Sequence, residues 1–228
     1  MARLIGGIFG RVAGKIGNFT VRTVNGKTFV STRPKNYKSS TSPKSIEVKQ
    51  KFAVTSTFTK GVLELPALFQ IWKLNKTPKK SEFNMVFSYN YAFSSPNAPT
   101  MRNIITPHGF VLPSASAEIK DGKVTVALSA LNSTIIVNDS EVNISINAVI
   151  CNYEPIKETE PFFKMISVSK DVIDFNFSEP CNLDMKLGIQ SAATTRDYNK
   201  KIIFLAVATK SAYNEIVRYS QSLSLQSN

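Results

Sequence analysis

The sequence has 228 residues, of which 43% are hydrophobic and 19% are charged. This composition excludes global disorder, because it supplies enough apolar side chains for a sizeable buried core. The net charge is +12, and it is concentrated at the start: residues 1–60 carry 12 Lys or Arg side chains and one acid, Glu47, whereas the remainder is close to neutral. Such asymmetry indicates a polyanion or an acidic partner surface, with a solvated basic segment that serves solubility as the alternative.

The first 17 residues combine many glycines with recurring apolar side chains. Glycine occupies positions 6, 7, 10, 14 and 17, and apolar residues recur at helical spacing, namely Leu4, Ile5, Ile8, Val12 and Ile16. The glycines disfavour a stable solvated helix, while small residues let another backbone approach closely. We therefore expect this segment to become ordered only when it packs on something. Its apolar run is too short, and is interrupted by Arg11 and Lys15, so no Sec signal peptide is predicted.

Residues 18–33 are predicted to form a β-hairpin, because Asn25-Gly26 suits the positive φ angles of a two-residue turn between alternating apolar residues. A basic, serine-rich connection follows over 34–42. We expect a helix to begin at Ser42-Pro43, with the hydroxyl as cap and the proline in the first turn. A second helical or irregular stretch covers 62–74 with an interruption at Pro66, and a short helix is predicted over 82–91.

From about residue 109 the hydrophobic period changes to two, which is typical of β-strands. A turn over 120–123 precedes alternation at 124–128. The clearest alternating strand of the chain comprises Val142, Ile144, Ile146, Ala148 and Ile150. Further strands are predicted over 163–168, 172–177, 182–189 and 201–209. The last segment also alternates, through Val217, Tyr219, Leu223 and Leu225.

These patterns predict a mainly β fold with some α: an N-terminal hairpin or arm and short helices, followed by an immunoglobulin-like antiparallel β-sandwich. We expect one integrated fold with three parts. They are a basic, glycine-rich arm and β-hairpin over 1–42, a helical or irregular segment over 43–108, and a β-sandwich over 109–228. No transmembrane segment is predicted, since no stretch reaches the roughly 20 apolar residues of a membrane span.

Several short motifs lie in the first 55 residues, namely Gly10, Gly14-Lys15-Ile16-Gly17-Asn18, Asn25-Gly26-Lys27, Arg33-Pro34, Ser42-Pro43 and the helix start at Gln50 and Phe52. With these motifs the chain resembles a family of uncharacterised Bacteroidota proteins of about 200 residues. The resemblance implies a glycine-rich start, a hairpin, a proline-initiated helix and an immunoglobulin-like C-terminal half. Pro43-Lys44-Ser45 departs from the Arg-Thr usual in that family. No activity is established for the family, so the resemblance implies no functional residues.

Residues that carry catalysis or bind metals are scarce. The only histidine, His108, lies in a predicted turn, and no nucleophile elbow accompanies it. Cys151 and Cys181 are far apart in sequence and lack the paired close spacing of a structural zinc site; a disulfide between them stays open. Gly14-Lys15 lacks the glycine and the hydroxyl residue that a phosphate-binding loop requires. We therefore expect no enzyme activity, no cofactor and no metal.

Two functions remain as hypotheses. The first is a structural, self-assembling subunit of a virion shell, tail or filament, which forms homo-oligomers. In it the N-terminal arm is ordered by a neighbour or faces nucleic acid, and the C-terminal strand pairs with an exposed edge of its own or of a neighbouring subunit. The residues expected to assemble are Ile5, Ile8, Gly10, Gly14, Val217, Tyr219, Leu223 and Leu225. A cytoplasmic or virion location is expected rather than Sec-dependent secretion.

The second hypothesis is a nucleic-acid-binding module that uses the basic hairpin. Its expected residues are Arg22, Lys27, Arg33, Lys35, Lys38 and Lys44, flanked by Phe19, Phe29 and Tyr37. Cations beside aromatic rings suit single strands, through phosphate contact and base stacking. As the alternative, the rings point into the packed face of the hairpin, which would leave only sequence-independent phosphate contact. An enzyme of another type and a carbohydrate-binding sandwich also stay open.

Overall fold

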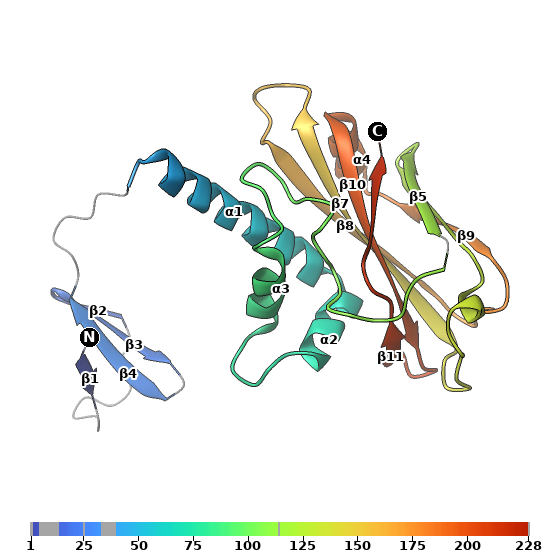
Figure 1. Ribbon diagram of the computed structural model, residues 1–228, viewed down its shortest axis with the longest axis horizontal. Coiled ribbons are helices and arrows are strands. Elements are labelled where there is room, and N and C mark those ends of the chain that lie inside the picture. Colours follow the sequence, from blue (N-terminus) through green and yellow to red (C-terminus); the bar gives the residue numbers. More distant parts are fainter. Residues whose placement is uncertain (1, 5–13, 25, 33–39, 114, 228) are drawn as a thin grey trace. The chain divides into compact units, whose positions relative to one another are not determined.

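The computed structural model describes residues 2–4, 14–24, 26–32, 40–113 and 115–227 (Figure 1). The chain divides into two compact units, Met1–Ser42 and Pro43–Asn228. Strands account for 39% of the residues and helices for 25%, and the sheets are antiparallel, so the predicted mainly β class with some helix is confirmed.

The first unit contains a small antiparallel sheet with the strand order β1-β4-β3-β2. Its strands are β1 (Ala2–Leu4), β2 (Gly14–Ile16), β3 (Phe19–Val24) and β4 (Lys27–Thr32). The predicted hairpin is confirmed, because β3 pairs with β4 and Val24 is the register partner of Lys27. The helical spacing at the start of the chain does not produce a helix in the described residues. There, β1 pairs with β4 and β2 pairs with β3.

The second unit, called the body here, begins with three helices. They are α1 (Pro43–Glu64), α2 (Pro66–Leu74) and α3 (Glu82–Asn90). As predicted, α1 begins at Pro43. Pro66 separates α1 from α2 because proline has no N–H for the helix ladder and pushes the residue before it, Leu65, into an extended conformation. The hydroxyl of Ser81 caps α3 by accepting a hydrogen bond from the Asn84 N–H at 3.2 Å.

Two antiparallel sheets make up the rest of the body. The larger has the order β11-β10-β7-β8, with β12 also paired to β10. Its strands are β7 (Asn143–Pro155), β8 (Phe163–Val172), β10 (Tyr198–Lys210), β11 (Ile216–Tyr219) and β12 (Leu223–Ser227). The smaller has the order β5-β6-β9, formed by β5 (Ala115–Lys120), β6 (Lys123–Leu128) and β9 (Cys181–Lys186). A 3-10 turn at Leu131–Ser133 and helix α4 (Ile189–Arg196) complete the body.

Several predicted elements differ from the structure. The strand expected over 163–168 continues to Val172, and the separate strand expected over 172–177 is absent, because Ile144 in β7 pairs with Val172 and the ladder ends there. The strand expected to reach residue 189 ends at Lys186. Helix α4 follows it and was not predicted, since its sequence IQSAATTR has no apolar stripe and Ile189 is 93% exposed.

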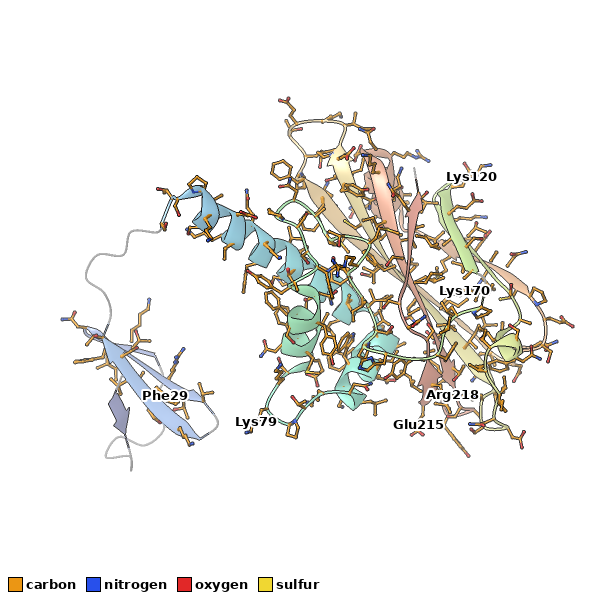
Figure 2. The ribbon with its side chains drawn as sticks, in the orientation of Figure 1. Phe29, Lys79, Lys120, Lys170, Glu215 and Arg218 are labelled. Carbon is orange, nitrogen blue, oxygen red and sulfur yellow. The ribbon has the colours of Figure 1, made fainter. Side chains whose placement is uncertain are left out.

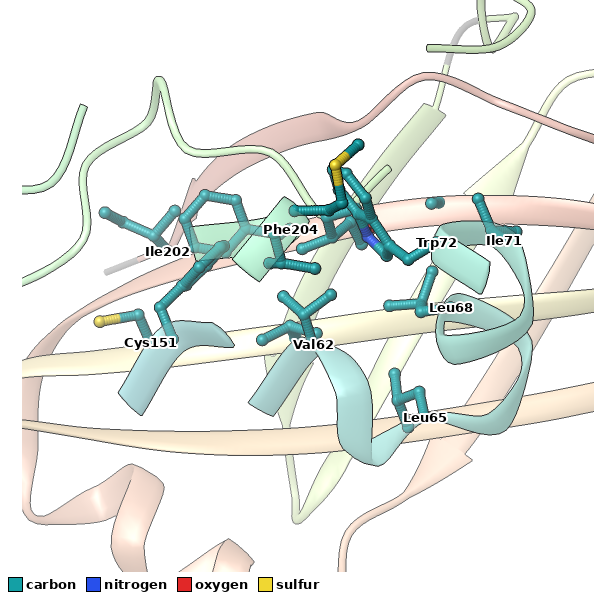
Figure 3. Packing of buried hydrophobic residues seen from close by; sticks show 14 of the residues in the cluster. Val62, Leu65, Leu68, Ile71, Trp72, Cys151, Ile202 and Phe204 are labelled. Carbon is teal, nitrogen blue, oxygen red and sulfur yellow. The ribbon is translucent and has the colours of Figure 1, made fainter. Parts of the chain in front are cut away.

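The larger sheet is covered on both faces, and two hydrophobic cores result. One core, called the sandwich core here, lies between the two sheets and contains Val126, Leu131, Ile146, Ile150 and Leu205 among other residues. The other, called the helix-side core here, joins the opposite face of the larger sheet to α1, α2 and α3 (Figures 1 and 3). In the helix-side core Phe58 of α1 meets Phe204 of β10 edge to face at 5.1 Å. The body is therefore a stack of helices, sheet and sheet.

The segment before β5 is locked to the C-terminal strands. The hydroxyl of Ser222 accepts hydrogen bonds from the N–H groups of Ile105 (2.7 Å) and Thr106 (2.9 Å). Gly109 has φ near +135°, and a Cβ there would lie 2.3 Å from the carbonyl oxygen of Tyr219, so glycine is required. Together these contacts fix the segment before β5 to the C-terminal strands.

Candidate interaction surfaces

The small N-terminal sheet has two chemically different faces. Successive residues of a strand point to opposite faces, and the register fixes which residues of neighbouring strands share a face. Because Ile16 pairs with Phe19 and Val21 pairs with Val30, these residues lie together on one face. We call this set (Ile16, Phe19, Val21 and Val30) the apolar face.

The opposite face carries cations, one aromatic ring and the exposed apolar side chain of Val24. Arg22 is the register partner of Phe29, Lys27 is two residues from Phe29, and Lys15 pairs with Thr20, two residues from Arg22. We call the set Lys15, Arg22, Lys27 and Phe29 the basic face. Figure 2 labels Phe29.

Much of the apolar face is open to solvent. Ile16 is 54% exposed and Phe19 is 47% exposed, whereas Val21, two residues from Phe19 in β3, is only 8% exposed. Scattered exposed apolar residues are ordinary, but neighbouring ones that continue a buried residue form a patch, and patches mark interaction sites.

The cations of the basic face have no acidic partner among the described residues. Lys15, Arg22 and Lys27 are exposed and Phe29 is half-buried. Residues 1–46 contain no Asp or Glu. Across the described residues, no ion pair or side-chain hydrogen bond engages these three cations.

The structure groups only part of the predicted nucleic-acid set. Arg22 and Lys27 share the basic face, and Lys44 lies in the first turn of α1, in the other unit. Of the flanking rings, Phe29 lies on the basic face and Phe19 on the apolar face. Arg33, Lys35, Lys38 and Tyr37 lie outside the described residues. Lys15 was missing from the prediction, because only the pairing of β2 with β3 brings it onto the basic face.

The predicted self-assembly set is also divided. Ile5, Ile8 and Gly10 lie outside the described residues, and Gly14 pairs with Val21 at the edge of the small sheet. Val217, Tyr219, Leu223 and Leu225 lie in β11 and β12, and both strands pair with β10 of the same chain. The C-terminal segment thus pairs with an edge within its own chain, which is one of the two alternatives predicted for it. Tyr219 packs on the helix-side core, and Leu223 and Leu225 pack on the sandwich core.

The start of α1 is a further exposed element. From Pro43 to Gln50 every residue except Ser45 is exposed, and Ile46 (43%) and Val48 (51%) add apolar surface there. Phe52 is 56% exposed although its ring lies 4.9 Å from that of Phe87 in α3. The first two turns of the helix therefore expose most of their side chains.

The body also carries an open pocket of about 520 Å³ near the end of β7. Its walls are mainly apolar and include Met101, Tyr153, Phe162 and Ile202. Glu154, also in the wall, has φ near +59° and pairs with Lys200 at 2.7 Å. Because that carboxylate already has a cation partner, the pocket presents apolar surface rather than an open charge.

Groups with catalytic potential do not gather in the described residues. His108 is exposed, and the centroid of its ring lies 6.3 Å from that of Tyr89. Cys151 and Cys181 are both free thiols, and burial raises the pKa of each, most strongly for Cys151. Within the part of the chain that the structure describes, no three His, Cys, Asp or Glu side chains come together in a possible metal site.

A buried electrostatic contact ties loop 136–141 to the larger sheet. The Glu141 side chain is fully buried and accepts hydrogen bonds from the Thr209 hydroxyl (2.6 Å), the Asn138 N–H (2.8 Å) and the Arg218 Nε (2.8 Å). Burial alone would raise the pKa of Glu141, but hydrogen bonds from Arg218, Thr209 and Asn138 outweigh burial and lower it. All carboxylate contacts are internal, so this cluster is structural.

Comparison of the chain with protein-family models, with curated proteins and with solved structures finds no match. No helix among the described residues combines the length and apolar character needed to cross a membrane. Function must therefore be argued from the surfaces themselves.

Proposed function

We propose that this chain is a non-enzymatic structural subunit of a higher-order assembly, such as a virion shell, a tail or a filament, and that it forms homo-oligomers. The observation that carries the proposal is the open apolar face of the N-terminal sheet. A sheet of this size with one face uncovered gains stability when a neighbour covers that face, by roughly 25 cal/mol for each Å² of apolar surface buried.

The exposed first turns of α1 support the same function. Apolar side chains that are exposed on a helix gain free energy when a partner covers them. Ile46 and Val48 supply apolar surface for that contact. The proposal places both exposed elements, the apolar face and the α1 start, between copies of the chain.

We further propose that the two facing sheets form an immunoglobulin-like sandwich. Two observations support this: the strands pair antiparallel within each sheet, and the two sheets share the sandwich core between them. The third layer, α1 to α3, is an addition to such a sandwich and covers the outer face of the larger sheet.

Size-exclusion chromatography with light scattering and electron microscopy of the peak test the proposed assembly. We expect particles much larger than the 25.2 kDa single chain. The variant Ile16→Ser/Phe19→Ser should shift the protein toward the single chain, because it removes the two most exposed side chains of the apolar face while leaving the basic face intact. A matched control, Ile189→Ser/Tyr213→Ser, removes two residues that are 93% and 89% exposed in the body and should leave the particles unchanged.

Two results would contradict the proposal. One is a wild-type protein that stays a single chain at every concentration. The other is equal loss of particles in both double variants, which would show a general effect of removing apolar surface.

A further inference from the structure

The basic face of the N-terminal sheet combines charge and an aromatic ring within a small area. Directly opposed residues in an antiparallel pair have Cβ atoms about 5 Å apart, which applies to Arg22 and Phe29. Lys27 is two residues along β4 from Phe29, or about 7 Å on the same face. Lys15 extends the face across β3 onto β2. Cations therefore flank the ring along its own strand and across the sheet.

The charge on this face has no compensating partner in its own unit. Residues 1–42 contain eight Lys or Arg and no acid. Like charges held together in one small unit repel each other, and a polyanion that binds them removes that repulsion and releases its own condensed counterions. The basic face thus fits a ligand with regularly repeated negative charge.

Phe29 narrows the class of polyanion. Neither solubility nor phosphate contact requires an aromatic ring among the cations. Single-stranded nucleic acids do use one, because an unpaired base stacks on the ring while the backbone runs past the cations. In a duplex the bases are stacked on each other and do not reach a ring on a flat sheet face.

We propose that the basic face binds single-stranded nucleic acid. Lys15, Arg22 and Lys27 contact phosphates, and Phe29 stacks on a base. The site goes beyond the assembly function and does not depend on it, because the apolar face lies on the other side of the same sheet. In an assembly, one face of this sheet would then contact a neighbouring subunit and the other would contact nucleic acid.

Fluorescence anisotropy with the full-length chain and a labelled oligothymidylate single strand tests the proposal over a range of salt concentrations. Wild-type binding should weaken steeply with salt. Lys15→Ala/Arg22→Ala/Lys27→Ala should reduce the slope of log affinity against log salt by about 2, since each phosphate contact on a single strand contributes about 0.7. Phe29→Ala should weaken binding roughly 5- to 150-fold with little change in that slope.

Matched variants separate the site from net charge and from misfolding. Lys79→Ala/Lys80→Ala/Lys186→Ala removes the same charge from exposed positions of the body and should leave affinity close to wild type; Figure 2 labels Lys79. Lys15→Arg/Arg22→Lys/Lys27→Arg and Phe29→Tyr keep the chemistry and should keep binding.

Three results would overturn the proposal. The first is equal weakening by the basic-face variant and by the body variant, which would show dependence on net charge alone. The second is unchanged affinity in Phe29→Ala together with equal binding of a duplex of the same sequence or of heparin. The third is no binding by the wild-type chain at low salt. Because Ile16→Ser/Phe19→Ser leaves the basic face intact, nucleic-acid binding by that variant stays measurable if assembly fails.

Discussion

Replacement of Glu141 by glutamine tests the buried carboxylate that ties loop 136–141 to β10 and β11. Glutamine keeps the size of the side chain but removes the charge and turns one acceptor into a donor. That donor then faces other donors, either the Asn138 N–H or the Arg218 guanidinium. Hydrogen bonds to charged groups contribute about 1.5–3 kcal/mol, so we expect Glu141→Gln to lower the free energy of unfolding by about 2–3 kcal/mol near pH 7.

The same variant predicts a specific dependence on pH. The pKa of Glu141 is lower in the folded protein than in the unfolded chain, so the ionised carboxylate adds stability above the unfolded pKa of about 4.3. That contribution is lost as the pH falls through the folded pKa. The difference in the free energy of unfolding between wild type and Glu141→Gln should therefore be largest near neutral pH and should shrink in acid below about pH 4.

Urea unfolding followed by tryptophan fluorescence measures this effect. The single tryptophan, Trp72, is completely buried in the helix-side core, so its emission reports the body alone. In thermal unfolding we expect the melting temperature to fall by about 4–12 °C, at roughly 2–4 °C for each kcal/mol in a unit of this size. Glu158→Gln, at an exposed position, should change stability by less than about 0.5 kcal/mol. An equal loss in Glu158→Gln, or a loss in Glu141→Gln that stays constant into acid, would refute the reasoning.

Three further predictions concern the core, the chain end and the thiols. Phe58→Ala should cost about 3–5 kcal/mol in urea unfolding, because a fully buried ring leaves a cavity beside the larger sheet, and a loss below about 1 kcal/mol would contradict that packing. Gly109→Ala should cost at least about 2 kcal/mol, because its Cβ would collide with the Tyr219 carbonyl, and a neutral result by the same measurement would contradict the tight approach. In native protein, iodoacetamide should label half-buried Cys181 before buried Cys151, and mass spectrometry showing the reverse order would contradict the burial.

Local elements with strong chemical signals could be predicted from the sequence alone. Asn25-Gly26 determines a hairpin because only this kind of pair accepts the positive φ angles of a tight turn. Pro43 begins a helix and Pro66 separates two, because a missing N–H is tolerated only in the first turn. These signals act over a few residues and need no tertiary contact.

Features that depend on packing could not be predicted in this way. The alternation around Ile146 in β7 indicates a strand with one polar face, yet Asn147 is also completely buried, because the helices cover that face. The same limit applies to helix α4, which has no apolar stripe and so leaves no periodic signal.

The candidate site also combines features that the sequence predicts with features that depend on packing. The sequence alone determined that the first quarter of the chain is basic and that Arg22, Lys27 and Phe29 belong to one hairpin. Only the tertiary structure decided that Lys15 joins them and that Phe19 lies on the opposite face. The physical reason is that side chains alternate along a strand, so a shift of one residue in register would exchange the two faces. Composition fixes how much charge a segment carries, whereas strand pairing fixes which charges share a surface.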